Sequence, residues 1–147
     1  MTEDCSSEER KGWLCNALMR VGTYMATVFD REMAHSGLTQ AQFRTLLSLV
    51  AEPLSPGELA RRSMLEKATV SLVAQRMVAA GWLARLPGAN RRTHLLCLTE
   101  QGQQVLQACL PAANQLADQA TSALDEEEQG QLRALLVKLE NHLRENT

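Results

Sequence analysis

The sequence lacks several patterns that would assign it to whole classes of protein. No apolar run approaches the roughly 18 residues of a membrane span, and the opening stretch MTEDCSSEERK lacks the basic-then-apolar pattern of a secretion signal. We therefore expect a cytoplasmic protein with no membrane partner. Four cysteines, Cys5, Cys15, Cys97 and Cys109, show no CxxC spacing, which favours reduced thiols over a disulfide framework and argues against a zinc site.

The patterns that mark an enzyme are missing as well. The three histidines, His35, His94 and His142, are scattered, and neither a glycine-rich phosphate loop nor a nucleophile paired with a base can be read. We predict no catalytic residue, no metal and no cofactor. With 147 residues, 45% of them hydrophobic, the chain fits a single domain over residues 1–147.

What the sequence does contain is a helix-turn-helix pattern that begins at residue 54. Ser55 is a good N-cap, Pro56 suits the first helical position, and the Glu58 side chain stands where it can reach back to the cap, which predicts a short helix over residues 56–62. A second helix is predicted over residues 67–80, where Gly81 supplies a left-handed stop. The second helix carries apolar residues at helical spacing, namely Val70, Val73, Ala74 and Met77.

After residue 81 the pattern changes from helix to hairpin. Residues 82–86 and 93–98 read as strands, and the turn-rich stretch 87–92 between them carries Arg91 and Arg92. A hairpin tipped by two arginines is typical of a wing. The predicted fold class is therefore mainly α with a small β-hairpin wing.

The charge of this stretch differs from that of the whole chain. The chain carries a net charge of −2, but residues 54–99 hold seven basic and two acidic side chains, a net charge of +5. A basic module between acidic flanks is expected when one face must meet phosphates. The charge therefore indicates double-stranded DNA as a partner.

The order and spacing of several short motifs resemble the winged helix of the multiple-antibiotic-resistance regulator (MarR) family. The matching stretches are Leu38-Thr39 with Gln42, Glu58-Leu59-Ala60, Thr69-Val70-Ser71, Arg76-Met77, Gly81-Trp82-Leu83, Asn90-Arg91-Arg92, and Leu98-Thr99-Glu100-Gln101-Gly102. Two departures stand out: Asn90 replaces the family's usual Asp, and Leu72 and Gln75 stand where Arg and Asp are common. The resemblance covers essentially the whole chain and implies a transcriptional regulator, with the winged helix-turn-helix at about residues 38–99.

The flanks of the winged helix predict long helices. A helix over about residues 7–34 should end at Gly37, and Thr39 with Gln42 should form a capping box for a helix that Pro53 closes. In that helix Phe43, Leu46, Leu47 and Val50 should pack under the winged helix. A long helix after residue 99 should be kinked or interrupted by Pro111, and Asp125 should cap the last one.

Apolar seams at the two ends of the chain suggest that the protein associates with itself. The seams consist of Leu14, Leu18, Val21, Met25 and Val28 near the N-terminus, and Leu132, Leu135, Leu136, Leu139 and Leu143 near the C-terminus. In the family that the chain resembles, such helices interlock across a two-fold axis. The resemblance thus implies a homodimer, with dimerisation helices over about residues 7–36 and 100–146, and packing of both seams within one subunit is the alternative.

The two-fold axis would place two recognition helices in successive major grooves of a pseudo-palindromic operator. For base edges we predict Lys67, Thr69, Ser71 and Gln75. Phosphate contacts are predicted at Ser55, Arg61, Arg62 and Arg76, with Asn90, Arg91 and Arg92 forming the wing in or beside the minor groove. Arg62 or Arg76 could equally hold a surface ion pair, and Arg85 more readily supports the hairpin than DNA.

Two triggers for release of the DNA are open. Family resemblance implies a small, often aromatic inducer in a cleft beside the winged helix, and its candidate lining residues are Trp13, Tyr24, Met25, Phe29 and Phe43. Core packing of these large apolar residues is the alternative.

The second trigger is oxidation of a thiol. The segment around Cys15 resembles the first helix of the family's organic-hydroperoxide sensors, in which the cysteine at this position reacts. However, Phe29 and Gln40 stand where those sensors carry tyrosines that hydrogen-bond the thiolate. A third hypothesis is a winged helix that binds protein rather than DNA, which would not need Arg91 and Arg92.

Overall fold

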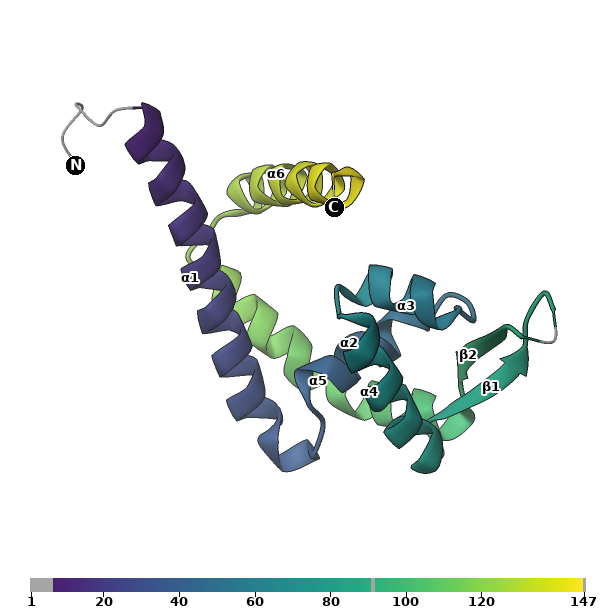
Figure 1. The fold of residues 1–147 in the computed structure, drawn as a ribbon. Coiled ribbons are helices and arrows are strands. Elements are labelled where there is room, and N and C mark those ends of the chain that lie inside the picture. The colour runs from purple at the N-terminus through teal and green to yellow at the C-terminus, as the bar shows by residue number, and fades with distance from the viewer. Residues whose placement is uncertain (1–6, 91, 147) are drawn as a thin grey trace. The chain divides into compact units, whose positions relative to one another are not determined.

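The computed structural model describes residues 7–90 and 92–146. Along the chain, the elements shown in Figure 1 are α1 (Ser7–Met33), the 3-10 turn η1 (Ala34–Ser36), α2 (Gln40–Ser48), α3 (Pro56–Ser63), α4 (Lys67–Ala79), β1 (Leu83–Pro87), β2 (His94–Leu98), α5 (Glu100–Thr121) and α6 (Glu126–Glu145). The mainly α fold with a β-hairpin is therefore confirmed. Within the described residues no helix combines the length and apolar character needed to cross a membrane.

The elements form two compact units that divide between Ala113 and Asn114, within α5. The first unit holds α1 to α4, the hairpin and the beginning of α5, and the second holds the end of α5 together with α6. The expectation of one domain over residues 1–147 stays a prediction.

Local capping chemistry sets where several helices begin. Thr39 accepts a hydrogen bond from the backbone N–H of Gln42 (3.2 Å), and the Gln42 side chain accepts one from the backbone N–H of Thr39 (3.0 Å), which completes the predicted capping box. Asp125 and Glu128 form the same box at the start of α6. Gly37 and Gly81 both have positive φ values, 70° and 83°, as expected for left-handed stops.

The core of the first unit lies where α2, α3 and α4 meet the hairpin. Leu46, Leu59, Val70, Met77 and Leu96 are all at most 1% exposed. They come from α2, α3, α4 (two residues) and β2, so the three short helices and the wing share one apolar centre.

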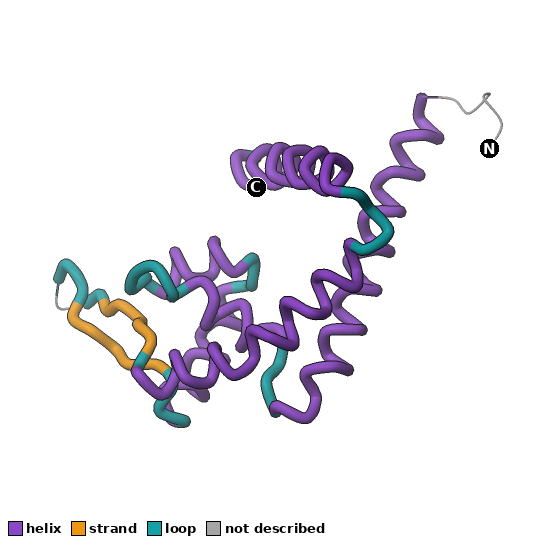
Figure 2. The backbone as a smooth tube through the Cα atoms, turned by 180° about the vertical axis from the view of Figure 1, so that it is seen from behind, coloured by secondary structure: helices purple, strands orange, loops and turns teal. Residues whose placement is uncertain are grey.

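The hairpin is a two-stranded antiparallel sheet, seen in Figure 2 as the orange pair of strands. Its register pairs Leu83 with Leu98 and Pro87 with His94. Leu54, just before α3, forms two backbone hydrogen bonds with Leu96, of 3.0 and 2.7 Å. This bridge ties the start of the helix-turn-helix to the base of the wing.

A tight junction joins the end of α4 to the beginning of α5. The Thr99 hydroxyl donates to the Gly81 carbonyl (2.6 Å) and accepts from the Gly102 backbone N–H (3.0 Å). The Thr99 N–H donates to the Trp82 carbonyl (3.1 Å). A Cβ at Gly102 would lie 2.0 Å from that carbonyl oxygen, so only glycine fits there.

Three expectations about α2 and the residues that follow it were wrong. Leu47 and Val50 are 49% and 59% exposed, because the buried face of this region holds Leu46 and Leu49 and the neighbouring positions turn away from it. α2 ends at Ser48, well before Pro53, since the Leu49 N–H closes a tight turn on the carbonyls of the preceding residues.

Pro111 does not interrupt α5. The helix runs continuously from Glu100 to Thr121 with the proline inside it. Proline removes one backbone donor, and a long helix can keep its remaining bonds around that gap.

Candidate nucleic-acid interface

The exposed face of α4 carries most of the side chains predicted to reach base edges. Its opposite face is held in the core by Val70, Ala74 and Met77. The side chains of Lys67, Ser71, Gln75 and Arg76 are exposed, whereas Thr69 is half-buried at the edge of this face. The predicted recognition residues thus share one side of one helix.

Sequence reasoning missed the residue near the middle of that face. Leu72 is 50% exposed although it is a large apolar side chain. Ala68, one turn before it, is exposed as well. The spacing was readable, because positions 68, 72 and 75 fall on one helical stripe, but the prediction had selected polar side chains only.

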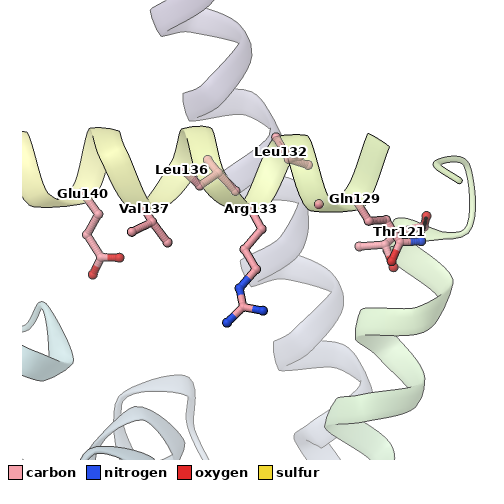
Figure 3. A pocket seen from close by; sticks show the side chains of 8 residues that line it. Thr121, Gln129, Leu132, Arg133, Leu136, Val137 and Glu140 are labelled. Atoms are coloured by element: carbon pink, nitrogen blue, oxygen red, sulfur yellow. Dashed lines mark hydrogen bonds between the residues drawn. The ribbon is translucent and has the colours of Figure 1, made fainter. Parts of the chain in front are cut away.

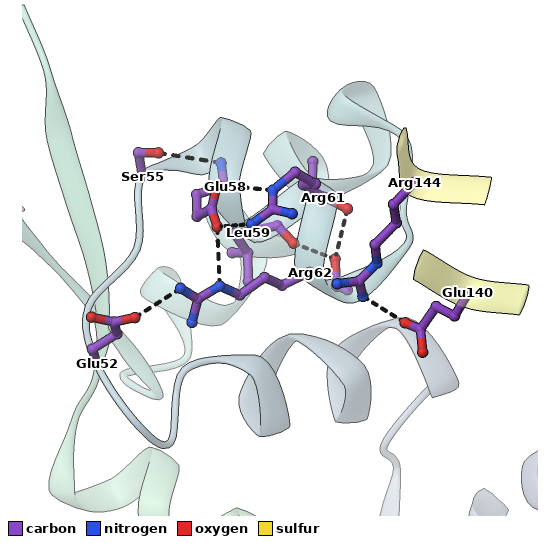
Figure 4. A network of polar contacts seen from close by, with 10 residues as sticks. Glu52, Ser55, Glu58, Leu59, Arg61, Arg62, Glu140 and Arg144 are labelled. Carbon is purple, nitrogen blue, oxygen red and sulfur yellow. Dashed lines mark hydrogen bonds and ion pairs between the residues drawn. The ribbon is translucent and has the colours of Figure 1, made fainter. Parts of the chain in front are cut away.

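Two of the predicted phosphate contacts, Arg61 and Arg62 in the last turn of α3, belong to an ion-pair network, shown in Figure 4. Arg61 donates through Nε and Nη2 to the two carboxylate oxygens of Glu58, at 3.1 and 2.5 Å. Arg62 donates through Nε to Glu58 (3.1 Å) and through Nη2 to Glu52 (2.8 Å). Two positive and two negative charges therefore offset one another within this network.

The network also corrects the expected cap of α3. The Ser55 hydroxyl accepts a hydrogen bond from the Glu58 backbone N–H (3.2 Å), so the N-cap is confirmed. The Glu58 carboxylate pairs with Arg61 and Arg62 rather than reaching back to Ser55, because two guanidinium groups offer it stronger, charge-assisted hydrogen bonds.

The network changes the titration of its members. Hydrogen bonds from Arg61 and then Arg62 lower the pKa of Glu58 from its ordinary 4.5 to about 2. Glu58 raises the pKa of Arg61, and Glu52 together with Glu58 raises the pKa of Arg62. Glu58, Arg61 and Arg62 are therefore charged at neutral pH.

The tip of the wing is organised by Asn90. Its Oδ1 accepts hydrogen bonds from the backbone N–H groups of Arg92 (3.0 Å) and Thr93 (3.1 Å). Asn is suited to such side-chain-to-backbone turns. The Arg92 side chain is exposed, and Arg91 lies outside the described residues.

The remaining cations of the winged helix are available to a partner. Among the residues that the structure describes, no ion pair engages Lys67, Arg76, Arg85 or Arg92. Lys67 and Arg76 lie on α4, Arg85 follows on β1, and Arg92 lies at the wing tip. This arrangement can neutralise phosphates on both sides of a groove.

The five predicted inducer contacts do not form a single cleft. Phe29 and Phe43 pack against each other, with ring centroids 5.1 Å apart, and against the core. Trp13, Tyr24 and Met25 are 56%, 73% and 39% exposed on α1. Among them, Tyr24 lines a shallow groove together with Met19, Arg20, Thr23 and Thr27.

The second unit contains a groove of its own along α6. As Figure 3 shows, the side chains of Arg133, Val137 and Glu140 extend from the same side of this helix, and Thr121 and Gln129 lie at one end. Gln129 donates a hydrogen bond to the Thr121 carbonyl (3.3 Å), which ties the start of α6 to the end of α5.

The cysteines and acidic residues suggest little further chemistry. Cys15 is exposed on α1, Cys97 is half-buried, Cys109 is buried, and all three are free thiols. Cys5 lies outside the described residues. Within the described part of the chain, no cluster of three or more His, Cys, Asp or Glu side chains could hold a metal ion.

Comparisons with known proteins agree with this architecture. The family model described as "MarR family" matches residues 36–92. An HTH-type transcriptional regulator of Bacillus cereus is 35% identical over 109 residues, which cover 71% of each chain. The multiple antibiotic resistance protein MarR of Escherichia coli is 31% identical over 69% of this chain and 73% of its own.

A solved structure extends the likeness to most of the chain. The DNA-binding protein BpsR of Bordetella bronchiseptica, in a structure that addresses its regulation by 6-hydroxynicotinic acid, superimposes with a TM-score of 0.79 at 27% identity. The match covers 86% of this chain and 98% of the other. The identity to the regulators and the shared winged helix lead to one conclusion: the chain belongs to the MarR family of transcriptional regulators.

Proposed function

We propose that this regulator is a homodimeric repressor that binds a pseudo-palindromic operator with α4 in the major groove and the hairpin beside the minor groove. The observation that carries this proposal is a set of exposed cations on and around α4 and at the wing tip that have no ion-pair partner among the described residues. A winged helix that binds another protein does not need such a set.

The contacts divide into two roles. Lys67, Thr69, Ser71 and Gln75 on α4 read base edges, where Gln75 has the bidentate geometry for adenine. Arg76 and the wing residues Arg91 and Arg92 contact phosphates or the minor groove. Asn90 holds the turn at Arg92 through its hydrogen bonds to the backbone N–H groups of Arg92 and Thr93.

The two arginines of α3 should bind phosphates more weakly than their formal charge suggests. The Ser55 hydroxyl accepts the Glu58 N–H and still carries its own proton, which can donate to a phosphate. Arg61 and Arg62 form ion pairs with Glu58 and Glu52, which partly neutralise their charge. Each therefore contributes less to the affinity for DNA than Arg76 or Arg92.

Self-association accounts for the apolar surfaces of the terminal helices. On α1, Leu14 and Val21 are 52% and 62% exposed, and on α6, Leu135 and Leu143 are 60% and 58% exposed. Such contiguous apolar stripes are expected to be covered in the functional protein. A second copy is the partner that the family relationship supports.

Release by a small ligand is supported by the likeness to BpsR, whose DNA binding is regulated by 6-hydroxynicotinic acid. We propose a small, aromatic inducer for this chain as well. Trp13, Tyr24, Met25, Phe29 and Phe43 remain its candidate contacts, and Tyr24 is the first to test because it lines a groove.

The wing offers a direct test of DNA binding. The double change Arg91→Ala, Arg92→Ala should weaken binding to every duplex and reduce the slope of log K against log[salt] by about two, since each phosphate contact contributes about 0.9. The matched control is Arg10→Ala, Lys11→Ala, which removes the same charge from α1. Equal effects from both pairs would show that total charge, and not the wing, determines binding.

A further inference from the structure

The exposed face of α4 contains an apolar strip that the polar contacts alone do not explain. Ala68 and Leu72 lie one turn apart, and Gln75 follows on the same stripe. Half of the Leu72 side chain is open to solvent, although α4 is anchored from the opposite side by residues as little exposed as Met77 (0%) and Val70 (1%).

The charged side chains around this apolar strip indicate what kind of surface it contacts. Lys67 and Arg76 lie on either side of Leu72 along the helix, both exposed and neither in an ion pair among the described residues. An apolar side chain framed by free cations fits a surface that is negative at its edges and apolar at its centre. In the major groove of DNA, phosphates provide the edges and the C5-methyl group of thymine is the apolar group on the floor.

We propose that Leu72, with Ala68 beside it, is a specificity-determining residue that recognises thymine methyl groups in the operator. This inference rests on the proposed function, because it requires α4 to enter the major groove. The leucine excludes water from the methyl group and selects thymine over cytosine, which presents no methyl there.

Gln75 defines the neighbouring position. Leu72 and Gln75 are three residues apart, about 4.5 Å along the helix axis, and stacked base pairs are about 3.4 Å apart. The two side chains therefore address the same or adjacent base pairs. Because Gln pairs with adenine, each half-site should contain a thymine beside or opposite the adenine that Gln75 reads.

Replacing thymine by deoxyuridine removes the methyl group and nothing else. The probe is a duplex selected by the wild-type protein from a random-sequence library, with each half-site thymine replaced in turn by deoxyuridine. Burying one methyl group is worth about a four-fold change in affinity. The wild-type protein should therefore lose about four-fold in affinity at one thymine per half-site, about sixteen-fold when both half-sites are changed.

Two variants assign that loss to a residue. Leu72→Ala should show a smaller preference for thymine over deoxyuridine than the wild type, because only Ala68 and the shortened side chain still contact the methyl group. Leu47→Ala truncates a leucine of nearly the same exposure, 49%, on α2 and should keep the full preference. Both replace an exposed side chain, and thermal melting followed by circular dichroism checks that each is folded.

The outcomes separate this inference from the proposed function. Salt-sensitive binding with no thymine preference in the wild type, or an undiminished preference in Leu72→Ala, would overturn the role of Leu72 and leave DNA binding standing. Failure of the wild-type protein to enrich any duplex would instead contradict the proposed function itself.

Discussion

Substitution of Gly102 by alanine tests the junction that fixes the wing relative to the helices. Alanine normally stabilises a helix relative to glycine by about 0.5–1 kcal/mol, and Gly102 lies within α5 without a positive φ. Here the new Cβ would lie 2.0 Å from the Trp82 carbonyl oxygen, so the two backbones must separate by about 1 Å. We therefore expect the sign of the substitution to reverse.

The magnitude follows from what the separation disrupts. Overpacking costs about 1–3 kcal/mol, and the hydrogen bonds of Thr99 to Gly102 and Trp82 contribute about 1 kcal/mol each. Gly102→Ala should thus lower the free energy of unfolding by about 2–4 kcal/mol. Gly57→Ala is the matched control, because a Cβ at Gly57 in α3 has no neighbour within 4 Å and should stabilise by up to about 1 kcal/mol.

Urea unfolding followed by circular dichroism measures both effects. All three proteins must be compared at one concentration, because association makes apparent stability depend on concentration. If Gly102→Ala matched or exceeded the stability of the wild type, the close approach of Gly102 to the Trp82 carbonyl would not constrain the junction between α4 and α5.

Three further predictions concern the network, the wing tip and the thiol. Because the arginines lower the pKa of Glu58 from 4.5 to about 2, its stabilisation is present above about pH 4.5 and is lost as the pH falls toward 2. Glu58→Gln should therefore be less stable to urea than the wild type at pH 7, with a difference that shrinks between pH 4.5 and 2; a constant difference would refute the ion pairs. Asn90→Ala removes the acceptor of two backbone hydrogen bonds, so amide exchange at Arg92 and Thr93 should accelerate several-fold while exchange at Leu96 in the sheet does not; unchanged exchange would contradict the turn. If oxidation releases the DNA, Cys15→Ser should abolish the dissociation of DNA that a hydroperoxide causes. A Cys15→Ser variant that still dissociates from DNA on oxidation would exclude Cys15 as the reactive thiol.

Features fixed by neighbouring residues were predictable from the sequence. The caps at Ser55, Thr39 and Asp125 were readable because a cap involves residues only three positions apart. The hairpin follows from two short strands with a turn between them. The spacing of apolar residues in α4 gave its buried face for the same reason.

Features that depend on distant contacts were not predictable. The pairing of Arg62 with Glu52 joins residues ten positions apart across a loop. The hydrogen bonds from Arg61 and Arg62 to Glu58 compete with the capping role that was expected of Glu58. The exposure of Leu47 depends on how α2 is rotated against its neighbours. Leu72 was missed because the prediction took polarity, and not exposure, as the mark of a DNA contact.

Binding of the wild-type protein to the DNA upstream of its own gene shows whether its winged helix recognises a specific DNA sequence. Fluorescence anisotropy should compare that duplex with a shuffled duplex of equal length and composition over a series of salt concentrations. We expect the protein to bind the upstream DNA tightly, with an affinity that falls steeply as the salt concentration rises. Binding to the shuffled duplex should be much weaker. Equal, weak binding to both duplexes, insensitive to salt, would contradict a winged helix that recognises DNA upstream of its own gene.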